Sequence, residues 1–197
     1  TPYYTNEDQI SVAKYAPWKP ISLVNIDEIA IGAIPTESTM TNPSQEFYPN
    51  GTSPKPDYDD SWPGDPDYLS DRFIRLSYRF KFDDNEYSLM APFTQIAYIP
   101  KQNGYFLNGD ENAAYQSTIV GFMENSIQNI GLVIPLPSSA NKIVSDYKIS
   151  ELEILFRESD GIAAKVLTTI DSGTISGESG ISNYYTYEYQ SRKPYRT

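Results

Sequence analysis

The sequence predicts a mainly β protein of antiparallel β-sandwich modules, with at most one amphipathic helix. The chain has 17 tyrosines among 197 residues, and tyrosine suits sheets and interfaces, where its ring packs and its hydroxyl stays hydrated. Its 15 prolines favour chain reversals and are excluded from helix interiors. Several short segments alternate apolar and polar residues with the period of two that is typical of strands.

Residues 1–71 are expected to form an extended arm with short strands and a long acidic loop. Residues 21–24 and 29–34 are apolar runs of strand length. Residues 35–71 are rich in Pro, Ser, Thr and Asp without a period, which predicts a loop at the surface.

Residues 72–128 are expected to contain a β-hairpin and the possible helix. The clearest strand pattern lies here, with a cationic outer row on what we expect to be an edge strand. Its inward residues are Ile74, Leu76, Tyr78, Phe80 and Phe82, and its outward residues are Arg75, Ser77, Arg79 and Lys81. Residues 83–86 are turn formers that precede a return strand at 87–91, and Pro92 then breaks this strand, which could resume at 96–99.

The helix is predicted from apolar residues at helical spacing, with Asp110 or Asn112 as its N-cap and Gly131 after its last turn. Residues 118–120 could equally form a strand. The apolar residues are Tyr115, Ile119, Phe122, Met123, Ile127 and Ile130.

Residues 129–197 are expected to be an immunoglobulin-like or fibronectin-like portion of the sandwich. Residues 132–134 read as a strand, and Leu152, Ile154 and Phe156 alternate with charged residues. The turn 159–161 then leads to a return strand that carries Ile162, Ala164, Val166 and Ile170. A Gly/Ser loop at 172–183 precedes the alternating strand with Tyr185, Tyr187 and Tyr189.

Composition excludes several classes of function. The formal net charge of −11 argues against sequence-specific binding to nucleic acid, which needs clustered Lys and Arg. No apolar run reaches the length of a membrane span. The chain has no Cys and no His, so most familiar hydrolase sites and zinc sites cannot be built. We therefore predict no catalytic, cofactor-binding or metal-binding residues.

Four groups of residues were weighed as sites. Acidic residues in the long loop are chemically suited to Ca²⁺, but their spacing does not fit an EF-hand, because Trp62 and Tyr68 stand where Gly and Glu are required. Two carboxylates beside aromatic rings could hydrolyse glycosides, and the best candidates are Glu86 beside Tyr87 and the aspartates around Trp62. The cationic row with Arg72 could bind an anion or an acidic partner, and the tyrosines of 184–189 could form a binding platform. The acidic residues of the loop are Asp57, Asp59, Asp60, Asp65, Asp67 and Asp71.

Four phrases resemble the large virion proteins of crAss-like and related podovirus-type bacteriophages, known as tail stabilisation or muzzle (nozzle) proteins. The phrases are residues 67–73 (DYLSDRF), 78–82 (YRFKF), 86–95 (EYSLMAPFTQ) and 187–195 (YEYQSRKPY). The resemblance spans about residues 65–197 and implies a β-rich component of the distal tail, without catalytic residues. Members are much longer. Together with a first residue, Thr1, that is not Met, this leads us to expect a fragment of a larger protein.

Two classes of function remain open. The first is a structural protein of the virion that assembles with other tail proteins and with copies of itself, in a symmetric ring around the DNA channel. An acidic channel wall would let DNA pass by repulsion. The alternative is a glycan-binding adhesin or receptor-binding β-sandwich module that uses Trp62 and exposed tyrosines.

Overall fold

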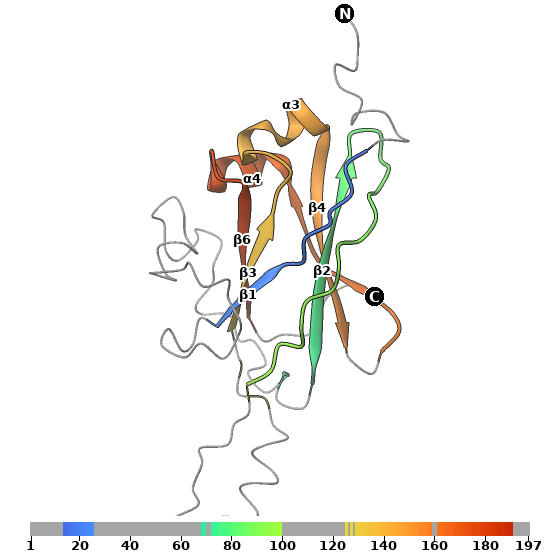
Figure 1. Ribbon diagram of the computed structural model, residues 1–197, viewed down its shortest axis with the longest axis vertical. Helices are drawn as coiled ribbons and strands as arrows, with labels where there is room; N and C mark the ends of the chain where they lie inside the picture. Colours follow the sequence, from blue (N-terminus) through green and yellow to red (C-terminus); the bar gives the residue numbers. More distant parts are fainter. Residues whose placement is uncertain are drawn as a thin grey trace, which may run out of the picture.

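The computed structural model describes residues 14–25, 68–69, 72–99, 125, 127, 129–158 and 161–190. Within these residues the protein is mainly β, as predicted, with two antiparallel three-stranded sheets. The sheets face each other, and the short helices lie together at one end (Figure 1). The predicted strand at 29–34 lies outside the described residues.

The first sheet has the order β1-β3-β6, with β1 at Ser22–Asn25, β3 at Asn129–Pro135 and β6 at Tyr184–Gln190. Leu132, at its centre, pairs with Leu23 on one side and with Tyr187 on the other. The strands predicted around 21–24, 132–134 and 185–189 are therefore confirmed.

The second sheet has the order β2-β4-β5, with β2 at Ile74–Phe82, β4 at Ile149–Glu158 and β5 at Lys165–Asp171. The alternation read from the sequence is confirmed, because the predicted core residues of β2 and β4 have no exposed surface. These residues are Ile74, Leu76, Tyr78, Phe80, Leu152, Ile154 and Phe156.

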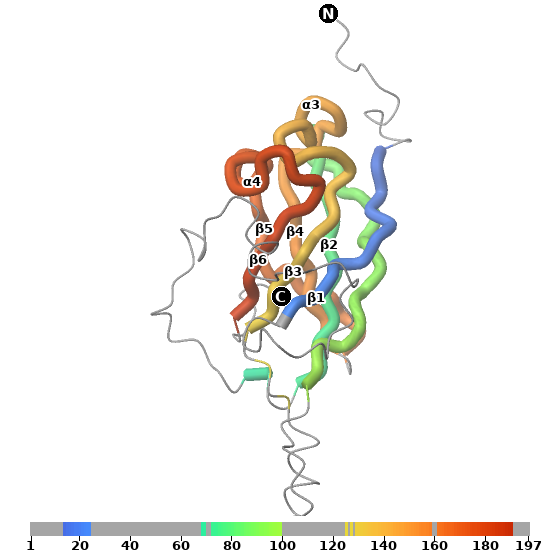
Figure 2. The backbone as a smooth tube through the Cα atoms, turned by 60° about the vertical axis from the view of Figure 1, so that its left-hand side comes forward, coloured from blue at the N-terminus to red at the C-terminus, as the bar shows by residue number. Residues whose placement is uncertain are grey.

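The two sheets lie face to face (Figure 2), and residues from both form a hydrophobic core between them. The rings of Phe156 in β4 and Tyr189 in β6 meet across it, with centroids 6.2 Å apart. All three predicted regions of the chain contribute strands to these sheets. β1 from the first region pairs with β3 from the third, and β2 from the second region pairs with β4 from the third. Burial of apolar surface against the opposite sheet is what stabilises each half.

The turn after β2 has the predicted residues and a standard hairpin geometry. The Phe82 amide donates to the Glu86 carbonyl (2.9 Å), and the Asn85 amide donates to the Phe82 carbonyl (3.0 Å). Asn85 has a φ of 66°, a left-handed conformation that asparagine tolerates well. The loop is therefore a three-residue hairpin loop that ends in a left-handed residue.

The return strand predicted at 87–91 is wrong in detail. Residues 87–99, here called the return segment, run antiparallel along β2, but they form only single bridges, Lys81 to Tyr87 and Ile74 to Ala97. β2 is the terminal strand of its sheet, as expected, but the return segment covers its free edge.

The return segment advances three residues for every two residues of β2. Every third amide of the segment donates to every second carbonyl of β2, at 2.8–3.0 Å. The pairs are Ser88 to Phe80, Ala91 to Tyr78, Thr94 to Leu76, and Ala97 to Ile74. Because of this mismatch, two amides of β2 donate to side-chain hydroxyls instead of to backbone carbonyls. The Phe80 amide donates to Ser88 Oγ (2.9 Å), and the Leu76 amide donates to Thr94 Oγ1 (3.0 Å).

Replacing Thr94 with valine is expected to lower the free energy of unfolding by about 1–3 kcal/mol, the cost of a buried polar group left without its partner. The side chain keeps its shape, but the buried Leu76 amide loses its acceptor. Urea unfolding measures the change, and amide exchange at Leu76 should accelerate. Thr169→Val, at an exposed position of β5, is the matched control. Equal stability of the two variants would show that the hydroxyl is dispensable.

The described helices are short and differ from the predicted one. A 3₁₀ turn, η2 at Ala140–Lys142, leads into α3 at Ile143–Tyr147, and α4 occupies Ser172–Ser179. The predicted helix is wrong at its C-terminal end, because Ile130 and Gly131 lie in β3 and pair with β1. Residues 115, 119, 122 and 123 lie outside the described part of the chain.

Two further expectations in the C-terminal part are corrected. Residues 172–179 form α4 rather than a loop, since the Asp171 carboxylate accepts from the amide (3.0 Å) and the hydroxyl (2.8 Å) of Thr174 and so caps the helix. Ile162 was placed in the return strand, yet β5 begins only at Lys165 and Ile162 is 98% exposed.

The end of the predicted acidic loop is not at the surface. Tyr68 and Leu69 are buried and belong to the core. The other residues of the loop, 35–67, 70 and 71, lie outside the described part of the chain. The expectation of a surface loop is therefore wrong for this end and untested elsewhere.

Candidate functional site: the outer face of β2 and β4

The outward residues of β2 and β4 form a charged face, called here the outer face, in which oppositely charged residues stand opposite each other. Arg79 pairs with Glu153, with Nε and Nη2 each 2.7 Å from Glu153 Oε2. Lys81 Nζ donates to Glu151 Oε1 (3.1 Å). This hydrogen bond is the main reason that the Lys81 pKa is raised. Glu153 is 6% exposed, so its ion pair is largely withdrawn from water.

The predicted cationic row is thus mostly neutralised within the sheet. Arg72 precedes β2 and is not part of this face, since its Nη1 donates to the Tyr68 carbonyl (2.9 Å) and its Nε is 4.0 Å from Glu158 Oε1. Arg75 differs, because its partner in the register is Arg157. The sequence predicted the row on β2, but it could not predict which residue of β4 faces each cation.

Two aromatic rings of the return segment lie against the outer face. The Arg79 guanidinium carbon is 4.1 Å from the Tyr87 ring centroid, and the corresponding distance from Arg157 to Phe93 is 4.4 Å. Such cation–π contacts hold the guanidinium planes in place. Ser77, between the charges, is fully buried and donates to the Ala91 carbonyl (2.7 Å).

The return segment also exposes large apolar side chains, which we call the return ridge and define as Tyr87, Leu89, Met90 and Ile96. Leu89 is 76% exposed and Met90 is 50% exposed. The step of three turns the small residues at 88, 91, 94 and 97 toward β2 and leaves the residues between them outside. Small residues at every third position were the sequence signal for this arrangement.

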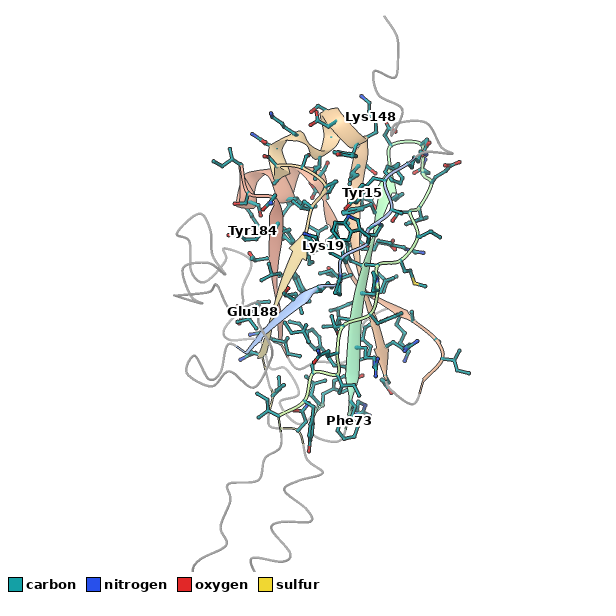
Figure 3. The ribbon with its side chains drawn as sticks, viewed as in Figure 1. Tyr15, Lys19, Phe73, Lys148, Tyr184 and Glu188 are labelled. Carbon is teal, nitrogen blue, oxygen red and sulfur yellow. The ribbon has the colours of Figure 1, made fainter. Side chains whose placement is uncertain are left out.

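The segment 14–21 crosses from the β2 hairpin toward β1 (Figure 1). Tyr15 packs against Phe80 and Tyr147, with ring centroids 6.0 and 5.5 Å away, as its position over β2 in Figure 3 indicates. The Lys14 ammonium donates to Asp84 and to Glu86 Oε2 (2.8 Å). Desolvation lowers the Lys14 pKa, but these two carboxylates outweigh it, and the pKa is raised.

Asp84 is expected to titrate below its ordinary pKa of 3.8, mainly because Lys14 donates a hydrogen bond to it. The ion pair therefore stabilises the folded state above the ordinary value, and its contribution is lost as the pH falls through the lowered pKa. Carboxyl ¹³C NMR measures this titration, and Lys14→Gln should bring the Asp84 midpoint back toward 3.8. Titration of Asp84 at its ordinary value in the unaltered chain would contradict the contact.

The carboxylates weighed as catalytic residues do not form a described site. Glu86 lies at the hairpin turn and is engaged by Lys14. The aspartates of the loop and Trp62 lie outside the described residues. In the described part of the chain, no three acidic side chains lie close enough to hold a metal ion.

The tyrosine strand contributes mainly to the core. Tyr185 and Tyr189 are buried in it, and Tyr187 packs against it. Tyr184 and Glu188 lie along β6 in Figure 3. Tyr185, Tyr187 and Tyr189 therefore serve packing rather than an exposed binding platform. Another buried phenol, Tyr78, has a raised pKa because burial disfavours its anion.

The chain matches no known family model, and no curated protein or solved structure shows significant similarity to it. No helix in the described residues is long and apolar enough to span a membrane.

Proposed function

We propose that the chain is a structural virion protein of a bacteriophage tail, a muzzle (nozzle) or tail stabilisation component that assembles with other tail subunits and copies of itself around the DNA channel. The resemblance of residues 65–197 to such proteins suggests the particle. A mainly β protein built from two facing sheets is compatible with an assembly role.

The return ridge is the observation that carries the proposal. Leu89, Met90 and Ile96 expose apolar surface along one continuous segment, which also carries the exposed ring of Tyr87. A row of exposed apolar side chains suits an interaction surface, and interface cores are enriched in Met and aromatic residues. Hydrogen bonds to β2 hold the segment in place, so the ridge is formed before a partner arrives.

Antibody labelling of purified particles from the source tests this proposal. Gold label confined to the tail is the expected result. Recovery of the protein only as a free monomer, with no label on any particle, would contradict it.

The proposal also implies that the chain has no enzymatic turnover. The lack of His and Cys removes the commonest general base and the thiol nucleophile. Screening the purified chain against polysaccharides and peptidoglycan should detect no cleavage. Reproducible cleavage that is abolished by Glu86→Gln or Asp67→Asn would establish an active site instead.

A second candidate, a glycan-binding adhesin, is favoured by one observation. Trp18 is 67% exposed, and an exposed indole can stack on a sugar ring. Lys19 lies 4.8 Å from the centroid of that ring. If the protein is an adhesin, a glycan array should show binding that Trp18→Ala removes and that Leu89→Ala leaves intact.

A further inference from the structure

The outer face holds one cross-strand pair that breaks its own charge pattern. Arg79 and Lys81 each face a glutamate, whereas Arg75 faces Arg157. Residues directly opposite each other in an antiparallel pair have Cβ atoms about 5 Å apart, and like charges at this spacing are destabilising. Both arginines are half-buried, so water screens this repulsion less than it would at a fully exposed site.

No acidic side chain in the described residues relieves the repulsion. Glu158 is adjacent to Arg157 in sequence, but strand alternation directs it to the opposite face, where it contacts Tyr68 and Arg72. Arg157 Nε is buried and has no hydrogen-bond partner within the described part of the chain. Since guanidinium groups do not deprotonate in proteins, a change of ionisation cannot remove the two charges.

One of the two guanidinium groups is also held in position. The Arg157 guanidinium lies over the Phe93 ring, and the return segment that carries Phe93 is hydrogen-bonded to β2. A guanidinium held in this way presents parallel N–H donors that match the two oxygens of a carboxylate or a phosphate.

We propose that Arg75 and Arg157 form a binding site for an oxyanion, which accepts hydrogen bonds from the accessible N–H groups of both guanidinium groups. The anion is supplied by the acidic side chain of another protein chain or by a free phosphate. The site does not depend on a tail function, because any acidic partner satisfies it.

The test is an NMR titration of the full chain that follows the Nε–Hε resonance of Arg157. Two probes are used separately at low ionic strength, a hexa-aspartate peptide and inorganic phosphate. A saturable shift with the peptide identifies an acidic side chain as the source, and a shift with phosphate alone identifies the free ion. If neither probe moves the resonance, the proposal is wrong.

Arg75→Gln is expected to weaken binding of the active probe at least tenfold, since one of the two donors is lost. Lys81→Gln is the matched control and should leave the affinity unchanged, because Lys81 already pairs with Glu151. Unchanged affinity in the Arg75 variant would overturn the two-arginine site.

A second measurement needs no probe. Without an anion, Arg75→Gln should raise Tm at low ionic strength by removing the repulsion from Arg157, and the gain should shrink as salt is added. If Arg75 served only to pack its aliphatic stem, the same variant would instead lower Tm. A lowered Tm would therefore contradict the repulsion on which the site rests.

Discussion

Replacing Phe80 with alanine should lower the free energy of unfolding by about 3–5 kcal/mol, the typical cost of removing a buried phenylalanine. Phe80 has no exposed surface, and its ring contacts those of Tyr78 and Tyr15 at centroid distances of 5.5 and 6.0 Å. The variant thus leaves a cavity in the core and also loosens the attachment of the segment 14–21. Equilibrium urea unfolding measures the loss.

The control for Phe80→Ala is Leu89→Ala, on the return ridge. Leu89 is 76% exposed, so its truncation should change stability by no more than about 0.5 kcal/mol. Similar losses for the two variants would mean that the inner face of β2 has been assigned to the wrong side.

Replacing Arg79 with methionine should cost about 2–3 kcal/mol, because it leaves the Glu153 carboxylate buried without its partner. Breaking a fully buried pair costs about 3–5 kcal/mol. The lower value is expected here since the Arg79 side chain is 30% exposed. Adding Glu153→Leu to this variant should recover most of the loss, because the double change removes both charges.

Lys81→Met serves as the comparison within the same face. Its acidic partner, Glu151, has a side chain that is 32% exposed, against 9% for Glu153, so the loss should be much smaller than for Arg79→Met. Thermal or urea unfolding at neutral pH distinguishes the two. A loss at Lys81 as large as that at Arg79 would show that burial of the acidic partner does not set the cost.

The sheets could be predicted from sequence because their pattern is local. In β2, apolar and polar residues alternate at a period of two, and a single buried face produces that pattern wherever the partner strand lies. The turn 83–86 was equally readable, since Asn85 supplies the left-handed residue that the turn requires.

The return segment escaped prediction because its period is neither that of a strand nor that of a helix. Small residues recur at every third position of this segment, at Ser88, Ala91, Thr94 and Ala97. The hydroxyls of Ser88 and Thr94 replace backbone acceptors. The helix α4 escaped for a different reason. Its sequence is rich in Ser and Gly, which have modest helix propensity, so the Asp171 cap and the burial of Ile175 decide its conformation.

The oxyanion site depends on register, which no local pattern reveals. Arg75 and Arg157 are far apart in the chain and stand opposite each other only because β2 and β4 pair as they do. A sequence analysis could find the cations of β2, but it could not say that two of the three facing positions on β4 were glutamate and the other was arginine.

The proposal that this chain works by association is tested most directly by electron cryo-microscopy of the intact source particle. The account predicts several symmetric copies on the tail, with the return ridge of Tyr87, Leu89, Met90 and Ile96 covered by a neighbouring chain. The contact should bury more than about 1,000 Å² in total, as stable interfaces do. A reconstruction in which the return ridge faces solvent in every copy would contradict it.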